Sequence, residues 1–128
     1  MKYLYQDLTE KIIKCFFDVY NHLGYGFLEK VYEKAMMVEL RKESLSAQSQ
    51  FPIHVLYKGE LVGDYCADIL VENKIILELK AAEILAHEHE LQLINYLKAT
   101  DIQLGLLFNF GKRPELRRKI FMNTRKHA

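Results

Sequence analysis

The sequence predicts an α/β fold in which a single mixed β-sheet is flanked by helices. Two observations carry this prediction. Helix-like and strand-like patterns follow the order helix, helix, several antiparallel strands, helix, strand. Residues 104–110 then form a continuous apolar run of strand length, typical of a central strand covered on both faces. A right-handed crossover through the preceding helix would make this strand parallel to the one before it.

Size and composition fit one domain with a single core, residues 1–128. The chain has 128 residues, of which half are hydrophobic, and this is enough to bury a sizeable core. No apolar run approaches the roughly 20 residues of a membrane span. The N-terminus lacks the apolar core and cleavage site of a signal peptide, so we expect a cytoplasmic protein without a membrane segment.

Two amphipathic helices are expected at the N-terminal end. Apolar side chains at helical spacing predict a first helix with Thr9 as a possible cap and Gly24 as its stop. After the following turn, a second apolar set over residues 28–40 predicts a helix that ends near Ser44. Residues 45–50 are polar and predict a loop.

Strands and a third helix follow. Residues 51–57 alternate loosely and lead into the turn signal Lys58-Gly59 and then Leu61-Val62, which predicts a hairpin. Apolar positions between about residues 86 and 100 predict the third helix. Residues 115–122 are compatible with either an edge strand or a short helix that has proline at its first turn.

Three charged side chains lie inside two strongly apolar strands: Asp68, Glu78 and Lys80. An isolated charge in an apolar interior costs several kcal/mol unless it is paired or bound to a metal. We therefore expect the two carboxylates and the ammonium to converge on one sheet face. A divalent cation facing a phosphate would account for such a cluster.

The register of the two strands decides whether the carboxylates can meet. With a two-residue loop, Asp68 would lie opposite Leu79 and point away from Glu78. With a three-residue loop over residues 72–74, in which Asn73 is left-handed, Asp68 pairs directly with Glu78. We expect the second register.

The helices offer further polar side chains. Gly26, Glu29 and Glu33 follow one side of the second helix, and Gln92 and Tyr96 are four residues apart on the third. Either glutamate and the amide could reach a site beside the sheet. The alternative is that these polar side chains are simply solvated.

The segment Gly26–Tyr32 resembles the signature of the GxxExxY proteins, a compact branch of the PD-(D/E)xK nuclease-like superfamily. Four further segments match in order: 63–68, 78–80 as the E-x-K element, 89–97 and 106–111. The similarity runs through nearly the whole chain. It implies a restriction-endonuclease-like core.

The resemblance also implies a metal site. Asp68 and Glu78 would be the metal ligands, with the backbone carbonyl of Leu79 as a third oxygen. Oxygen-only coordination suits Mg²⁺ or Mn²⁺ better than zinc. Lys80 would orient or help to deprotonate the attacking water.

Supporting residues are implied in the same way. Glu29 or Glu33 would hold a coordinated water or a second ion, and Gln92 would support the site from the third helix. One position departs from the pattern, because Ala67 stands before Asp68 where many active members of the wider superfamily have proline.

These observations favour a metal-dependent nuclease that hydrolyses phosphodiester bonds of DNA or RNA, with nucleic acid as its partner. The alternative is a catalytically inactive nuclease-like module that binds nucleic acid or a protein partner. A third interpretation is a purely structural ion-pair cluster. Phe16, Phe17, Phe108, Phe110 and most tyrosines are assigned to the core or to a self-association surface rather than to base stacking, so a homodimer is considered too. Cys15 and Cys66 are expected to be buried thiols, without the spacing of a zinc site.

Overall fold

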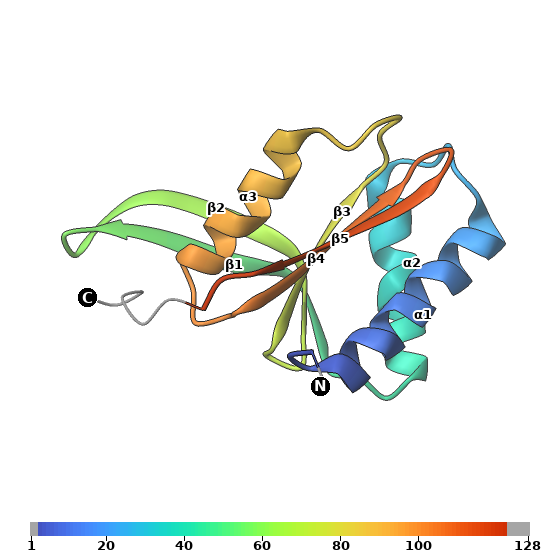
Figure 1. Ribbon diagram of the computed structural model, residues 1–128, viewed down its shortest axis with the longest axis horizontal. Coiled ribbons are helices and arrows are strands. Elements are labelled where there is room, and N and C mark those ends of the chain that lie inside the picture. The colour runs from blue at the N-terminus through green and yellow to red at the C-terminus, as the bar shows by residue number, and fades with distance from the viewer. Residues whose placement is uncertain (1–2, 123–128) are drawn as a thin grey trace.

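The computed structural model describes residues 3–122. Its elements are, in chain order, α1 (Gln6–Leu23), α2 (Glu29–Lys42), β1 (Ala47–Tyr57), β2 (Glu60–Val71), β3 (Ile75–Lys80), α3 (His87–Lys98), β4 (Leu104–Phe110) and β5 (Pro114–Ile120). The strands form one sheet in the order β1-β2-β3-β4-β5, in which β3 and β4 are parallel and all other neighbours are antiparallel. Figure 1 shows α1 and α2 on one side of the sheet and α3 on the other. The predicted α/β fold with one mixed sheet is confirmed.

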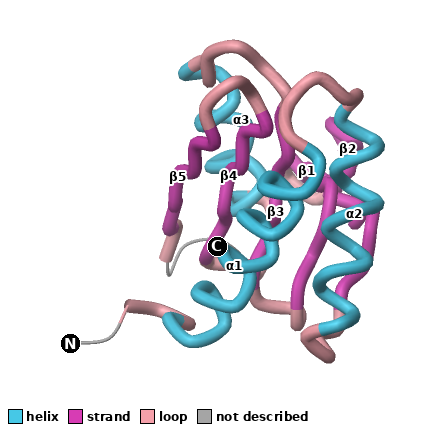
Figure 2. Tube along the Cα trace, turned by 90° about the vertical axis from the view of Figure 1, so that its right-hand side faces the viewer, coloured by secondary structure: helices cyan, strands magenta, loops and turns pink. Residues whose placement is uncertain are grey.

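Most of the predicted elements are present. The hairpin joins β1 and β2, β4 is buried along its whole length, and β4 runs parallel to β3. The segment left open between strand and helix is β5, an edge strand antiparallel to β4. Figure 2 shows the strands side by side, with helices packed across them. Among the described helices, none is both long and apolar enough to span a bilayer.

Two local predictions were wrong. The polar residues 45–50 are not all loop, because β1 begins at Ala47 and pairs with the end of β2. An edge strand needs only its backbone for pairing, and polar side chains on such a strand can stay in water. Thr9 does not cap α1, since the helix begins at Gln6 after Tyr5 and Thr9 is buried inside it.

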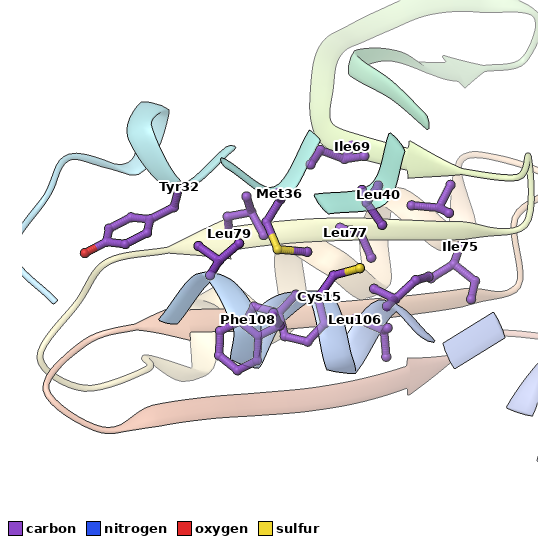
Figure 3. Close-up of a cluster of buried hydrophobic side chains, with 14 of the residues drawn as sticks. Cys15, Tyr32, Met36, Leu40, Ile69, Ile75, Leu77, Leu79, Leu106 and Phe108 are labelled. Atoms are coloured by element: carbon purple, nitrogen blue, oxygen red, sulfur yellow. The ribbon is translucent and has the colours of Figure 1, made fainter. Parts of the chain in front are cut away.

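The larger core lies between the α1–α2 layer and the sheet (Figure 3). Phe16 of α1 stacks on Phe108 of β4, with ring centroids 4.4 Å apart. Cys15 lies in this core, where burial raises the pKa of its thiol to about 11. Cys66 is exposed instead, so the expectation of two buried thiols was wrong for this residue. Its neighbour Ala67 packs in the core beneath α3, so the side chain of Cys66 lies on the other face of β2, where it is exposed.

On the opposite face, α3 approaches the sheet closely at Gly105. A Cβ atom on Gly105 would lie 2.5 Å from Cδ1 of Leu93, closer than packed atoms allow. Leu93 and Leu97 of α3 pack there with Ile76 and Leu107 of the sheet. This contact sets the distance between α3 and strands β3 and β4. It therefore also sets how far the polar side chains of α3 lie from the sheet.

The turn between α1 and α2 is closed by Tyr32. Gly24 and Gly26 have φ values of 68° and 111°, in the region that favours glycine. The Tyr32 hydroxyl donates to the carbonyl of Gly24 at 2.7 Å and accepts the N–H of Phe27 at 3.2 Å. The Tyr32 ring stacks on Phe110 of β4 at 4.2 Å. The start of α2 is thereby attached to the sheet.

We predict that Tyr32→Phe lowers the free energy of unfolding by about 1–2 kcal/mol, because two backbone groups lose a partly buried partner. Urea unfolding at constant pH measures this change. Tyr25→Phe, at an exposed tyrosine of the same turn, is the matched control and should leave stability unchanged. Equal stabilities of the Tyr32 variant and the wild type would show that the hydroxyl does not hold the turn.

Candidate functional site

The register of β2 and β3 brings two carboxylates opposite one another. Ile69 pairs with Leu77, so the next position in the same register joins Asp68 and Glu78. The connecting loop is Glu72–Lys74, and its central residue has a φ of 53°. The predicted three-residue loop and its register are therefore confirmed.

At this point the carboxylates replace the hydrogen bonds of the strand ladder. The Leu79 N–H donates to Oδ2 of Asp68 at 2.7 Å, and the Asp68 N–H donates to Oε1 of Glu78 at 3.0 Å. Each strand is thus tied to a side chain of its neighbour where it would otherwise bond the neighbour's backbone. Both carboxylates are fixed in position by one oxygen each.

The second oxygen of each carboxylate accepts no hydrogen bond from the described residues. Within residues 3–122, Thr9 Oγ1 is the one fully buried side-chain oxygen or nitrogen that lacks a hydrogen-bond partner, so neither of these two carboxylate oxygens is fully buried. Oδ1 of Asp68 and Oε2 of Glu78 are therefore within reach of solvent. Two anchored carboxylates with accessible oxygens can accept a cation.

Strand β2 changes face at Asp68. Ala67 packs in the core beneath α3, whereas Ile69, two residues later, packs in the core beneath α1 and α2. Residues two apart on a regular strand share a face, so the strand is distorted between them. Opposite this place on β1, Gln50 has a φ of 55°. The irregularity frees the Asp68 side chain to turn toward β3.

Burial and like charge weaken the acidity of both carboxyl groups. Glu78 is only 4% exposed, and burial, followed by the charge of Asp68, raises its pKa to about 8. Burial also raises the pKa of Asp68, and the charge of Glu33 adds to this rise. The N–H of Leu79 and the charge of Lys80 act in the opposite direction. The positive charge of Lys80 does not compensate the burial and mutual repulsion of the two carboxylates.

Lys80 lies two residues after Glu78 and shares its strand face. Its positive charge lowers the pKa of both carboxyl groups. It forms no ion pair or hydrogen bond with the described residues. The structure thus brings Asp68, Glu78 and Lys80 together and leaves the amine available.

The two helix glutamates differ in their surroundings. Glu33 is 7% exposed, accepts a hydrogen bond from Nε2 of Gln50 at 2.9 Å and pairs with Lys30 at 3.4 Å. Glu29 is exposed at the first turn of α2, and its charge raises the pKa of both site carboxyl groups. Glu33 thus links α2 to β1, whereas Glu29 is exposed and acts on the two carboxyl groups through its charge alone.

Gln50 was missed by sequence analysis because it fell in the segment predicted as a loop. A left-handed backbone at a glutamine, unlike one at glycine or asparagine, leaves no trace in the sequence. Its partner Glu33 gave no sign either, since a helix glutamate is usually solvated.

On the α3 side, the phenol of Tyr96 lies near the carboxylates. Burial raises the pKa of Tyr96 to about 12, and the charges of Glu78 and Asp68 contribute. Gln92 lies one turn earlier, in a cavity that Tyr96 also lines. It makes no hydrogen bond with the described residues, so it is close to the site without contacting its carboxylates.

Asn109 is a second polar residue that sequence analysis did not single out. It is fully buried on β4, accepts the N–H of Ala82 at 2.9 Å and donates to the carbonyl of Ala82 at 2.8 Å. A Cβ on Gly111 would meet that carbonyl oxygen at 2.2 Å. The segment after Lys80 is therefore clamped to β4. A polar residue inside the apolar run 104–110 was the signal that could have found it.

The donor set fits a hard cation in part. No group of three or more His, Cys, Asp or Glu side chains gathers as a metal site within residues 3–122. Asp68 and Glu78 offer oxygen atoms only, which Mg²⁺ and Mn²⁺ prefer. Mg²⁺ commonly binds through one or two carboxylates and keeps several waters. Two carboxylates, with water for the remaining positions, meet this requirement, and the carbonyl of Leu79 remains a predicted third ligand.

The raised pKa of Glu78 gives a pH dependence with a definite sign. In the unfolded chain this carboxyl ionises near 4.5, and in the folded protein near 8. Its contribution to stability is complete below the lower value and is lost as the pH rises through the higher one. Without divalent cations, the wild type should therefore lose a few kcal/mol more than Glu78→Gln between about pH 5 and pH 8.

Urea unfolding in EDTA at the two pH values measures this difference. Addition of Mg²⁺ should restore stability at the higher pH in the wild type and not in the variant. Identical pH dependence of the two proteins would show that Glu78 ionises normally in the fold.

Comparisons with known proteins agree with this architecture. The solved structure described as "Crystal structure of SSO0001" superimposes with a TM-score of 0.57 and 16% sequence identity, over 71% of this chain and 50% of that one. The chain thus spans half the length of that protein, and at this identity the similarity shows the fold alone. No curated protein matches the sequence significantly. A family model described as PD-(D/E)XK nuclease superfamily matches residues 6–120. The chain therefore belongs to the PD-(D/E)XK nuclease superfamily.

Proposed function

We propose that this protein is a metal-dependent nuclease that hydrolyses phosphodiester bonds of DNA or RNA. Asp68 and Glu78 would hold Mg²⁺ or Mn²⁺, and Lys80 would act on the phosphate and the attacking water. The observation that carries the proposal is the arrangement of the two carboxylates. Each is anchored by one oxygen to a backbone N–H and has its other oxygen accessible beside a lysine without an ion-pair partner in the described chain.

The chain's own residues have distinct roles in this proposal. Asp68 and Glu78 supply fixed negative charge, and their anchored oxygens prevent them from swinging apart. The bound cation would supply activation of water and neutralisation of charge at the phosphate. The ammonium of Lys80 would donate hydrogen bonds to the attacking water or to a phosphate oxygen, where negative charge grows during displacement.

We also propose that the chain is a GxxExxY protein, in which the signature builds one corner of the site. Gly26 and Tyr32 shape the turn that leads into α2, and Glu29 stands at the first turn of that helix. The charge of Glu29 reaches both site carboxyl groups. We infer that Glu29, rather than Glu33, joins the site through water.

The second candidate is a nuclease-like module that binds nucleic acid or a protein partner without cutting it. It is favoured by the absence, within residues 3–122, of a third acidic or histidine side chain close enough to share a metal ion. The surface around Asp68, Glu78 and Lys80 would then bind the partner. A cytoplasmic location and a homodimeric state stay predictions from the sequence.

Cleavage assays test the enzyme directly. We predict that the protein cuts at least one of single-stranded DNA, duplex DNA, branched DNA or RNA in Mg²⁺ or Mn²⁺. Asp68→Ala and Lys80→Ala should abolish this activity and keep the fold, as judged by circular dichroism. Asp68→Asn, which keeps an acceptor for the Leu79 N–H, should also unfold at a higher temperature than the wild type above about pH 8 without metal, because it relieves repulsion of Glu78.

Asp64→Ala is the matched control, since this exposed aspartate of β2 lies outside the carboxylate pair. It should cut as the wild type does. Absence of cleavage on all four substrates with either metal would overturn the enzyme in favour of the binding module.

Calorimetric titration with Mn²⁺ separates the roles of the acidic residues. Glu78→Ala should remove the binding heat, and Glu29→Gln should weaken binding about tenfold, as loss of an outer-sphere carboxylate does elsewhere. Glu33→Gln should retain affinity and lower the free energy of unfolding by about 1 kcal/mol, because its charged bond to Gln50 is lost. Reversed effects of the two glutamine variants would place Glu33 at the metal instead.

A further inference from the structure

A cavity of about 740 Å³ lies between the β1–β2 hairpin and α3. In Figure 1 this hairpin extends to the left, well beyond the other strands, and α3 lies above it. The volume is in the range of sites for small organic groups. The lining used in the argument below comes from the hairpin and from α3: Val55, Leu56, Tyr65, Gln92, Asn95 and Tyr96. We call this space the hairpin cavity.

Two tyrosines form an aromatic wall of the hairpin cavity. The rings of Tyr65 and Tyr96 are 5.9 Å apart and tilted by 42°. Tyr96 is almost fully buried, whereas Tyr65 is 50% exposed and so keeps aromatic surface open to the cavity. A Cβ on Gly63 would lie 3.0 Å from the Tyr65 ring, so a larger residue at this position would crowd the ring. Open aromatic surface of this kind stacks on planar groups.

The same cavity offers hydrogen-bonding groups that have no partner in the described chain. The side-chain amides of Gln92 and Asn95 line it, and neither makes a hydrogen bond with the described residues. An amide both donates and accepts, as the edge of a nucleobase does. The other lining residues are the apolar Val55, Leu56, Leu91 and Ala99 and the ionisable His54, Glu88 and Lys98. The aromatic, amide and apolar groups together match a planar polar ring system.

Tyr96 and Tyr65 connect the hairpin cavity with the carboxylate pair. Tyr65 precedes Asp68 by three residues on β2, which corresponds to about 10 Å along a strand. Tyr96 is near enough to both carboxylates for their charges to raise its pKa. A strand with a phosphate at Asp68 therefore has neighbouring bases within reach of the cavity.

We propose that the hairpin cavity binds an unpaired base of the substrate strand, next to the phosphate that a cation bound by Asp68 and Glu78 would hold. This inference rests on the proposed function and specifies its substrate as single-stranded or locally unpaired nucleic acid. A base inside a duplex is stacked on both faces and paired at its edge, so it cannot reach the ring of Tyr65 or the two amides. Stacking on aromatic side chains is the usual way in which unpaired bases are held.

Fluorescence anisotropy with labelled oligonucleotides tests the proposal on the full chain in the Lys80→Ala background with Mg²⁺, so that the cation can bind and nothing is cut. This protein should bind a single strand more tightly than the duplex of the same sequence. Tyr65→Ala should weaken single-strand binding roughly tenfold or more, as removal of one stacking partner does. Tyr65→Phe should retain it. Tyr57→Ala, on the same hairpin and outside the cavity lining, is the matched control.

Three results would overturn the proposal: preference for the duplex, absence of single-strand binding, or unchanged affinity of Tyr65→Ala. A fourth is a dimer of the wild type, seen by light scattering, that Tyr65→Ala dissociates while single-strand affinity stays the same. The cavity would then hold a second copy of the chain. Circular dichroism of Tyr65→Ala and Tyr65→Phe verifies that both variants are folded.

The experiments test the proposed nuclease activity and the proposed base site separately. Cleavage that depends on Asp68, together with binding that ignores Tyr65, would retain the nuclease and reject the base site. Binding that depends on Tyr65 in a protein that cuts nothing would do the reverse.

Discussion

The reciprocal bonds between Asp68 and β3 are the constraint on which the site depends. One carboxylate takes the N–H of Leu79, and the carboxylate of Glu78 takes the N–H of Asp68. Two carboxylates of the candidate site thereby serve as part of the backbone bonding between β2 and β3. Their separation is set by the sheet rather than by flexible side-chain packing, and this is the precision that a cation or a phosphate requires.

This arrangement opposes folding in the absence of a cation. Burial and mutual repulsion raise the pKa of both carboxyl groups. The fold tolerates the cost because β3 is anchored on both faces. Leu77 packs beneath α1 and α2, and Ile76 packs beneath α3 at the level that Gly105 permits. Stability supplied by the two cores is thus available to a site that is itself unfavourable, as at many functional sites.

Much of the fold could be predicted from the sequence, because hydrophobic periodicity and turn residues specify it. The three-residue loop around Asn73 determines the register of β2 and β3, and this register places Asp68 opposite Glu78. The distortion of β2 could not be predicted, since it depends on a left-handed Gln50 on the neighbouring strand. The choice between helix glutamates was equally hidden, because it follows from what each one contacts in three dimensions.

The clamp formed by Asn109 divides the connection from β3 to α3 into two parts. Ala82 is held by both its backbone groups, whereas Glu83 and Ile84 beyond it are exposed. Insertions or substitutions after Ala82 would therefore be absorbed without displacing the end of β3. Changes in this connection would thus leave the end of β3, with Glu78 and Lys80, in place.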